Sequence, residues 1–321
     1  MGHRLLDELI IPRLTSVAPA EQNDAALLEA GGMRLAFTTD GYVVDPPLFP
    51  GGTIGSLAVH GTVNDLAMMG ARPLWLSCAL LIEEGFGQDE LAAVLDDMRR
   101  AADAAGVSIV TGDTKVLPRG KADRIFITTS GIGVVEHGLA IHGAGARAGD
   151  RIILSGTMGD HGMAVMAARE GIDCGPLKSD SAPLWGMVEL LLDSAGTALH
   201  VLRDPTRGGV ATTLKEIALQ SSVSITLEEA DIPVRPEVAG LCGILGLDPM
   251  YVANEGKLLA FVAPESAEAA LDAVRSHPAG ASAAIIGTVE QGEAGRVRMR
   301  TSVGGMRMIE MLAGEQLPRI C

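Results

Sequence analysis

Aspartates occur in three short stretches of the sequence that follow or adjoin apolar runs. Asp40 closes the run MRLAFTTD, Asn64 and Asp65 lie in GTVNDLAMMGARP, and Asp113 lies in VTGDTKV. Carboxylate oxygens are the ligands that Mg²⁺ prefers, and aspartates from several strand ends commonly hold such a cation against nucleotide phosphates. Each one alone would more often cap a helix or form an Asx turn. Three together make a metal and nucleotide site an equal alternative.

Lys115 lies two residues beyond Asp113, so an extended chain would place both side chains on the same side of a strand. It could neutralise a transferring phosphate or take part in proton transfer, although a lone lysine is more often an exposed surface residue. No Walker A loop is present, because Gly256-Lys257 is followed by leucine. Any use of a nucleotide is therefore expected to be of a non-P-loop kind.

Two glycine-rich turns open helical patterns in the second half of the chain. One is GDHG, with Asp160 and His161, and the other is RDPTRGG, with Asp204 and Arg207. The backbone N–H groups and the dipole of a helix start can bind an anion, which Arg207 would assist. Plain helix capping explains both turns equally well, and His161 alone is more often a satisfied turn residue.

Two further residues are candidates for proton transfer and covalent chemistry. Glu255 lies in the stretch ANEGK, just before the apolar strand LLAFV, where desolvation could raise its pKa into the range of a general base; an ordinary turn is the alternative. Cys321 is the last residue of the sequence, after Pro318-Arg319-Ile320. A thiol in that position completes no helix or strand, so we expect it to react rather than to pack, with a frayed terminus as the alternative.

The segments that must position these residues alternate between strand and helix patterns. Short β-branched or apolar runs predict strands, and amphipathic spacing predicts helices. The predicted strands are 33–40, 73–84, 107–112, 123–136, 151–156, 223–227, 257–263, 283–289 and 296–301, and the predicted helices are 88–105, 161–171, 183–195, 208–221, 236–246 and 265–276. A glycine-rich polar segment, 142–150, predicts a boundary between two α/β domains, 1–145 and 146–310. Residues 311–321 are predicted to form a mobile tail that can reach a cleft of its own or a neighbouring subunit.

Composition narrows the class of protein. The chain has 321 residues, enough for about two domains, and 47% of them are hydrophobic. The net charge of −15 argues against a nucleic acid or an anionic membrane as partner. The four cysteines form no C-x-x-C pair, and Cys78, Cys174 and Cys242 are expected to be structural thiols. No secretory leader or long apolar run is evident, so a soluble cytoplasmic protein is expected.

The motifs GTVNDLAMMGARP, VTGDTKV, LRDPTRGG and VANEGKL, with the terminal PRIC, together resemble the HypE family of hydrogenase maturation proteins, which are carbamoyl dehydratases. The resemblance covers about residues 4 to 321. This family belongs to an ATP-using superfamily with aminoimidazole ribonucleotide synthetase (PurM) and selenophosphate synthetase. The first two motifs are similar across the superfamily, whereas the terminal PRIC is specific to the HypE branch.

The resemblance implies a PurM-like α/β (α+β) fold with two domains. The N-terminal domain would pair its strands across a homodimer, a larger C-terminal domain would follow, and ATP would bind between them near the dimer interface. It also implies a reaction in which the carbamoyltransferase HypF loads a carbamoyl group onto the terminal cysteine. This protein would then dehydrate the S-carboxamide to an S-cyanide with ATP. The cyanide would go to iron on a HypC–HypD scaffold for the [NiFe] hydrogenase centre.

The residue roles that the resemblance implies fall into three sets. Cys321 would carry the substrate covalently, and Lys115 and Glu255 would handle charge and protons around the carboxamide. Asp40, Asp65 and Asp113 would bind Mg²⁺. The ATP-binding set would be Asp40, Asn64, Asp65, Asp113, Asp160 and Asp204.

The start of the chain departs from the family pattern. Family members usually begin with a glycine-rich H-G-x-G-G segment that helps to cover ATP, and here only Gly2-His3 remains of it. Two other functions stay open on the sequence alone. One is a superfamily relative that uses ATP on a free small molecule, as a selenophosphate synthetase or a cyclo-ligase does. The other is a non-catalytic carrier that presents a loaded cysteine.

Overall fold

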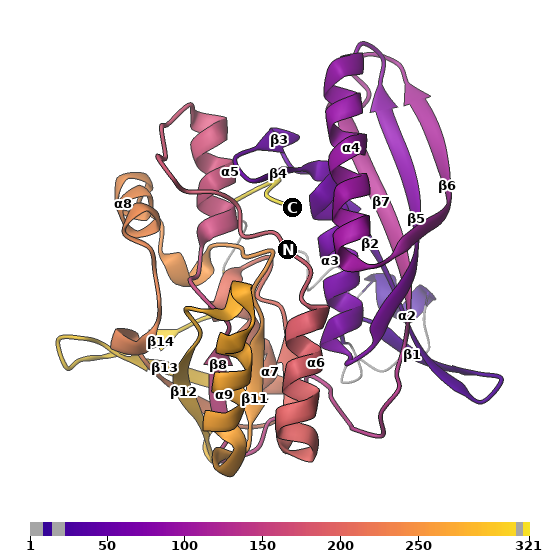
Figure 1. Cartoon of the computed structure of the whole chain (residues 1–321). Coiled ribbons are helices and arrows are strands. Elements are labelled where there is room, and N and C mark those ends of the chain that lie inside the picture. Colours follow the sequence, from indigo (N-terminus) through magenta and orange to yellow (C-terminus); the bar gives the residue numbers. More distant parts are fainter. Residues whose placement is uncertain (1–8, 15–22, 313–316) are drawn as a thin grey trace.

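The computed structural model of the chain describes residues 9–14, 23–312 and 317–321 (Figure 1). Two halves follow each other along the sequence, and each is built on one large sheet. The Gly2-His3 pair and residues 313–316 of the predicted tail lie outside the described residues. Within the described ranges, no helix is long and apolar enough to cross a membrane.

The first half is a five-stranded sheet in the order β1-β2-β7-β5-β6, with two long helices on one face (Figure 1). All four strands and the helix predicted here are present. The elements are α2 (Ile11–Leu14), β1 (Ala26–Ala30), β2 (Met33–Tyr42), β3 (Leu48–Phe49), β4 (Gly52–Thr53), α3 (Ile54–Met68), β5 (Arg72–Glu83), α4 (Gln88–Ala105), β6 (Ser108–Leu117) and β7 (Ile125–Val134).

Helix α3 is the longest element that the sequence patterns did not predict. Thr53 caps it, accepting a hydrogen bond from the Gly55 N–H at 3.0 Å, and Ser56 bonds back to the Thr53 N–H. Nearly every residue of the helix is buried, because the sheet lies on one side of it and the second half on the other. A helix buried all round has no polar face, so it shows no amphipathic period.

The second half is a seven-stranded sheet in the order β14-β13-β10-β12-β8-β11-β9. Helices α6 and α9 pack together with Leu199, Leu258 and Ala260, whereas α7 packs in a separate cluster with Phe261. Helices α5 and α8 contribute to the apolar cluster that also contains α3. The elements are β8 (Arg151–Leu154), α5 (Asp160–Glu170), α6 (Trp185–Ala195), β9 (Leu199–Arg203), α7 (Gly209–Gln220), β10 (Ser224–Glu228), α8 (Pro236–Leu245), β11 (Leu259–Val262), α9 (Ala267–Ser276), β12 (Ala284–Glu290), β13 (Arg296–Arg300) and β14 (Met306–Ile309), with short 3₁₀ turns between them.

The last five residues lie beside β3, β4 and α5 (Figure 1). Leu317 and Ile320 are buried in the cluster shared by the two halves. The structure thus supplies a resting position for the chain end, which the sequence did not give. The mobility of the tail stays a prediction, as do the homodimer and the domain boundary near residue 145.

Candidate active site

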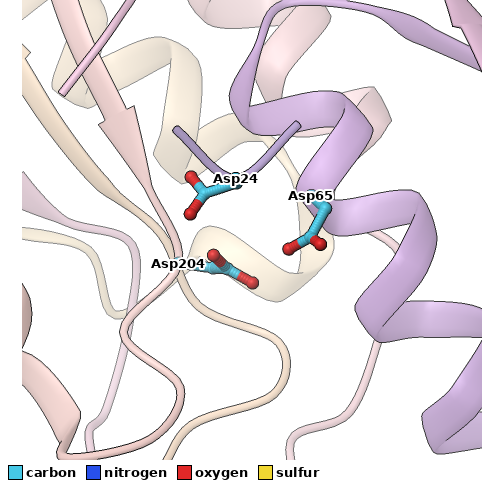
Figure 2. Close-up of side chains that lie close together, drawn as sticks. All are labelled: Asp24, Asp65 and Asp204. Atoms are coloured by element: carbon cyan, nitrogen blue, oxygen red, sulfur yellow. The ribbon is translucent and has the colours of Figure 1, made fainter. Parts of the chain in front are cut away.

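Three aspartates meet where the two halves adjoin (Figure 2). Asp24 precedes β1, Asp65 lies on α3, and Asp204 directly follows β9. One carboxylate oxygen from each lies within 4.8 Å of the others. Thr38 donates a hydrogen bond to Asp65 at 2.8 Å, and Arg203 forms an ion pair with Asp24 at 2.9 Å. We call these three residues the acidic cluster.

Burial makes the charges of the acidic cluster costly. It raises the pKa of Asp24 to about 6, despite the lowering effect of Arg203. It raises the pKa of Asp204 to about 8, with Asp24 adding to the effect, and that of Asp65 well above its usual value. Three crowded carboxylates that resist ionisation are a donor set that a hard divalent cation would stabilise. The cluster therefore fits a Mg²⁺ ion.

Two residues of the predicted ATP and metal sets lie next to the cluster without joining it. Asp40 lies inside β2 rather than after it, because the strand runs two residues further than predicted. It accepts a hydrogen bond from Tyr42 at 3.2 Å, and its charge helps to raise the pKa of Asp65. Asn64 instead connects the halves: its amide nitrogen donates to the Ala182 carbonyl at 3.0 Å, and its oxygen accepts from the Leu184 N–H at 2.8 Å.

Glu255 and Cys321 come together in the same region. Glu255 is 3% exposed, and its Oε1 is a buried atom with no hydrogen-bond partner among the described residues. Burial, followed by the charge of Asp204, raises the pKa of Glu255 well above its usual value. Burial and then the charge of Glu255 raise the pKa of the Cys321 thiol to about 12, against the effect of Arg207, whose guanidinium lies 4.0 Å from Sγ. The structure thus brings together two of the three predicted catalytic residues.

Asp160 lies near the acidic cluster but is not a member of it, since Asn254 bonds both to the Gly159 N–H and to the Pro205 carbonyl. Asp160 is 2% exposed, and its Oδ2 accepts hydrogen bonds from Thr157 at 2.5 Å and Arg235 at 3.1 Å. Together with Lys178 and Lys257 it lines a cavity of about 420 Å³, whose lining contains no member of the acidic cluster. Its predicted role in ATP binding stays a prediction.

Asp113 and Lys115 lie apart from this region in the described chain. The two side chains are on the same side of β6, as predicted, and Lys115 Nζ lies 2.7 Å from Asp113 Oδ1. The prediction that Asp113 follows a strand is wrong, since β6 continues to Leu117.

The register of the sheet shows how far apart they are. Asp40 pairs with Thr129 of β7, Thr129 with Cys78 of β5, and Cys78 with Gly112 of β6. Three strand spacings separate Asp40 from the neighbourhood of Asp113, about 14 Å. Within one chain, therefore, Asp113 does not join Asp40 and Asp65 around a single ion, because β6 is the outer strand of the sheet.

Asp24 is the residue of this region that the sequence analysis missed. It stands in the polar stretch EQNDA, ahead of a strand that was itself not predicted, and no motif marks it. Arg203 directly precedes Asp204, so the RDPTRGG turn could have suggested a buried ion pair. Its partner Asp24, 179 positions earlier, becomes visible only in the fold.

Comparisons with known proteins agree with this architecture. Residues 22–135 match the family of the AIR synthase related protein, N-terminal domain, and residues 147–300 match the corresponding C-terminal domain. The fold and these two matches therefore place the chain in the class of two-domain AIR synthase related, PurM-like proteins.

Individual relatives define the family within that class. A protein of Rhizobium leguminosarum bv. viciae named carbamoyl dehydratase HypE is 53% identical over 300 residues, which cover 93% of this chain and 86% of that protein. The solved structure of a hydrogenase maturation protein HypE in complex with ATP is 50% identical, covers 100% of this chain and 96% of its own, and superposes with a TM-score of 0.87. A HypE–HypF complex contains a chain that is 45% identical, with coverage of 96% and 99% and a TM-score of 0.89. The chain belongs to the HypE family of hydrogenase maturation proteins.

Proposed function

We propose that this protein uses ATP to dehydrate a carboxamide carried on its own Cys321, giving an S-cyanide for the iron of a [NiFe] hydrogenase. The observation that carries the proposal is the position of Cys321. Its thiol lies in a buried region beside Glu255 and Arg207, next to a cluster of carboxylates suited to a cation. Curated relatives named carbamoyl dehydratase support the same reaction.

The chemistry of the step accounts for the residues around the thiol. A carboxamide oxygen is a poor leaving group, and ATP supplies the phosphoryl group that converts it into a good one. The C–O bond then breaks as phosphate leaves, both nitrogen protons are lost, and a C≡N bond remains on sulfur. Glu255 is suited to accept one of these protons, because a carboxylate whose pKa is raised by burial is a stronger base than an exposed one. Arg207, near the sulfur, is suited to balance negative charge there.

Asp24, Asp65 and Asp204 are the residues that would hold Mg²⁺, with Asp40 beside them. A bound magnesium ion supplies charge neutralisation for the phosphates of ATP. Relative to the sequence prediction, this set replaces Asp113 by Asp24 and Asp204, and it moves Asp40 to a neighbouring position. A solved HypE structure in complex with ATP supports nucleotide binding.

A homodimer would bring Lys115 to this region. Strand β6 forms one edge of its sheet, and every residue from Ser108 to Val116 is exposed. Val110 and Val116 are 61% and 68% exposed, which is unusual for apolar side chains on an open edge. We infer that β6 pairs with a second copy, so that Lys115 and Asp113 of one subunit serve the cleft of the other.

The proposed reaction implies two partners, a carbamoyltransferase and an iron scaffold. HypF would load the carbamoyl group onto Cys321, and the solved HypE–HypF complex supports that pairing. A HypC–HypD scaffold would receive the cyanide. We place the protein in the cytoplasm, where its four free cysteines would stay reduced.

The test follows the mass of the C-terminal peptide. Carbamoylated protein incubated with MgATP should lose the mass of one water from the peptide that contains Cys321, and omission of ATP should leave the mass unchanged. An unchanged mass with MgATP contradicts the proposal. Cys321→Ser separates it from the alternative of a freely diffusing substrate, because an enzyme of that kind would keep its turnover without the thiol.

A further inference from the structure

The last five described residues, 317–321, form a segment that we call the docked tail. The Val43 N–H donates to the Cys321 carbonyl at 3.1 Å, and the Asp45 N–H donates to the Arg319 carbonyl, also at 3.1 Å. Leu317 and Ile320 are 8% and 3% exposed. The docked tail therefore continues the hydrogen bonding beyond β2 and anchors itself with two apolar side chains.

The side chain of one arginine on α5 binds backbone carbonyls of the docked tail. Arg169 Nη1 donates to the Pro318 carbonyl at 2.8 Å, and Nη2 donates to the Arg319 carbonyl at 2.6 Å. The same guanidinium donates from Nε to the Asp45 carbonyl at 2.8 Å. Its planar set of donors thus joins the tail to the segment that follows β2 and fixes two consecutive tail residues.

A histidine at the other end of α5 holds the next residue. His161 Nε2 lies 2.8 Å from the Ile320 carbonyl, and Nδ1 lies 2.8 Å from the Ser179 hydroxyl. A carbonyl can only accept, so Nε2 carries the proton and Nδ1 of the neutral ring accepts from Ser179. Burial lowers the pKa of His161 and so favours the neutral ring. The ring edge also packs against Phe49, with 5.5 Å between the ring centroids.

We propose that Arg169 and His161 are positioning residues that hold the chain end in register, so that the group carried on Cys321 lies beside Glu255. Together they bind the carbonyls of the three residues that precede the cysteine, and neither side chain touches the thiol in the structure. This inference rests on the proposed function for its catalytic consequence. The docking itself can be measured without that function.

The first measurement is the rate at which iodoacetamide alkylates Cys321. In the docked tail the Cys321 side chain is half-buried, so the reagent reaches the thiol more readily when the tail leaves. Arg169→Ala removes two charge-assisted bonds to the tail and should speed alkylation about 10- to 100-fold, with a smaller increase for Arg169→Lys. Arg275→Ala is the matched control: Arg275 also lies in the last turn of a helix and donates to a backbone carbonyl, Ala283, but it does not contact the tail. An unchanged rate in both Arg169 variants overturns the proposal.

Cys242 reports on folding in the same sample. It is 2% exposed, so global unfolding would expose it to the reagent, whereas release of the tail would not. If Arg169→Ala labels Cys242 as well, Arg169→Lys and His161→Phe decide the question. His161→Phe keeps the ring shape against Phe49 and removes the donor, whereas His161→Gln restores an N–H near the position of Nε2. Faster alkylation in His161→Phe and a return towards the wild-type rate in His161→Gln support the proposal. Equal alkylation rates in these two variants contradict it.

The second measurement connects docking to chemistry. In single turnover with MgATP, Arg169→Ala and His161→Phe should slow conversion of the carbamoyl group while the KM for ATP stays unchanged, because neither residue contacts the acidic cluster. Faster alkylation with an unchanged conversion rate overturns the positioning role. If the wild-type protein fails to convert its carbamoyl group while the variants still alkylate faster, the proposed function is wrong and the docking role of the two residues stands.

Discussion

Two regions of the molecule carry similar acidic side chains: the buried region around Asp65 and Cys321, and the exposed strand β6. The pKa values of these side chains shift in opposite directions in the two regions. In the buried region, burial raises the pKa of Asp204 to about 8 and that of the Cys321 thiol to about 12. On β6, the hydrogen bond from Lys115 lowers the pKa of Asp113, which is 60% exposed. Similar motifs thus produce groups that resist ionisation in one place and an ordinary ion pair in the other. What differs is access to water.

The largest effect is expected at Glu255. Glu255→Gln keeps the shape of the side chain and removes its basic oxygen, so it should slow dehydration about 10²- to 10⁴-fold and leave ATP affinity unchanged. Single-turnover kinetics and nucleotide titration measure the two quantities. Glu293→Gln, in an exposed ion pair with Arg296, is the matched control. Loss of ATP binding in Glu255→Gln would contradict a role as the base and would assign Glu255 to the nucleotide site.

Subunit mixing tests whether Lys115 on β6 of one subunit completes the site that contains Glu255 in a second copy. Lys115→Ala and Glu255→Gln should each inactivate a homodimer, but a mixed dimer would contain one site with both native residues. A random equal mixture should therefore regain about a quarter of wild-type activity. Activity that stays at the level of the separate variants after subunit exchange would confine both residues to one chain or exclude Lys115 from the reaction.

His60 tests how burial shifts a pKa at a residue that takes no part in the proposed reaction. Burial lowers its pKa from 6.5 to about 4, and its Nδ1 lies 2.9 Å from the Ser181 hydroxyl. The unfolded chain therefore binds a proton before the folded chain does. The contribution of His60 to the free energy of unfolding should be full above about pH 6.5 and be lost as the pH falls towards 4, by about 3 kcal/mol at most.

Denaturant unfolding at several pH values measures this contribution. His60→Asn, which keeps an amide near the position of Nδ1, should lack this part of the pH dependence. A variant that loses stability in parallel with the wild type would assign the acid sensitivity to other groups.

The smallest expected effect is on thermal stability, and it tests whether Mg²⁺ binds at the acidic cluster or at β6. Asp65→Asn should raise the melting temperature without Mg²⁺, because it relieves repulsion among buried carboxylates, and it should abolish the stabilisation by Mg²⁺. That stabilisation is about 1.4 kcal/mol for the wild type at a Mg²⁺ concentration ten times the dissociation constant. Asp113→Asn is the comparison variant and should leave both quantities nearly unchanged. Thermal melts with and without Mg²⁺ measure both quantities. Loss of the Mg²⁺ stabilisation in Asp113→Asn but not in Asp65→Asn would assign the ion to Asp113.

Regular patterns in the sequence predicted much of the fold. Helix α4 was predicted at the bounds that the structure has, because its apolar residues follow the helical period on one face and water solvates the other. Helix α3 was missed because neighbours cover all its sides, which leaves no period to detect. Strands β1 and β9 were also missed: β1 (ALLEA) contains no β-branched or aromatic residue, and β9 (LHVLR) contains only one.

The sequence by itself determined the kinds of group available: the aspartates, Glu255, and a cysteine at the end of a P-R-I-C segment. Their types and motifs also indicated the family. Only the tertiary structure decided which of them meet. It joined Asp24 to Asp65 and Asp204, kept Asp113 on an outer strand, and placed a half-buried Cys321 beside Glu255. The reason is physical: distances between segments far apart in the chain, and the removal of water that shifts each pKa, arise from packing and leave no local trace in the sequence.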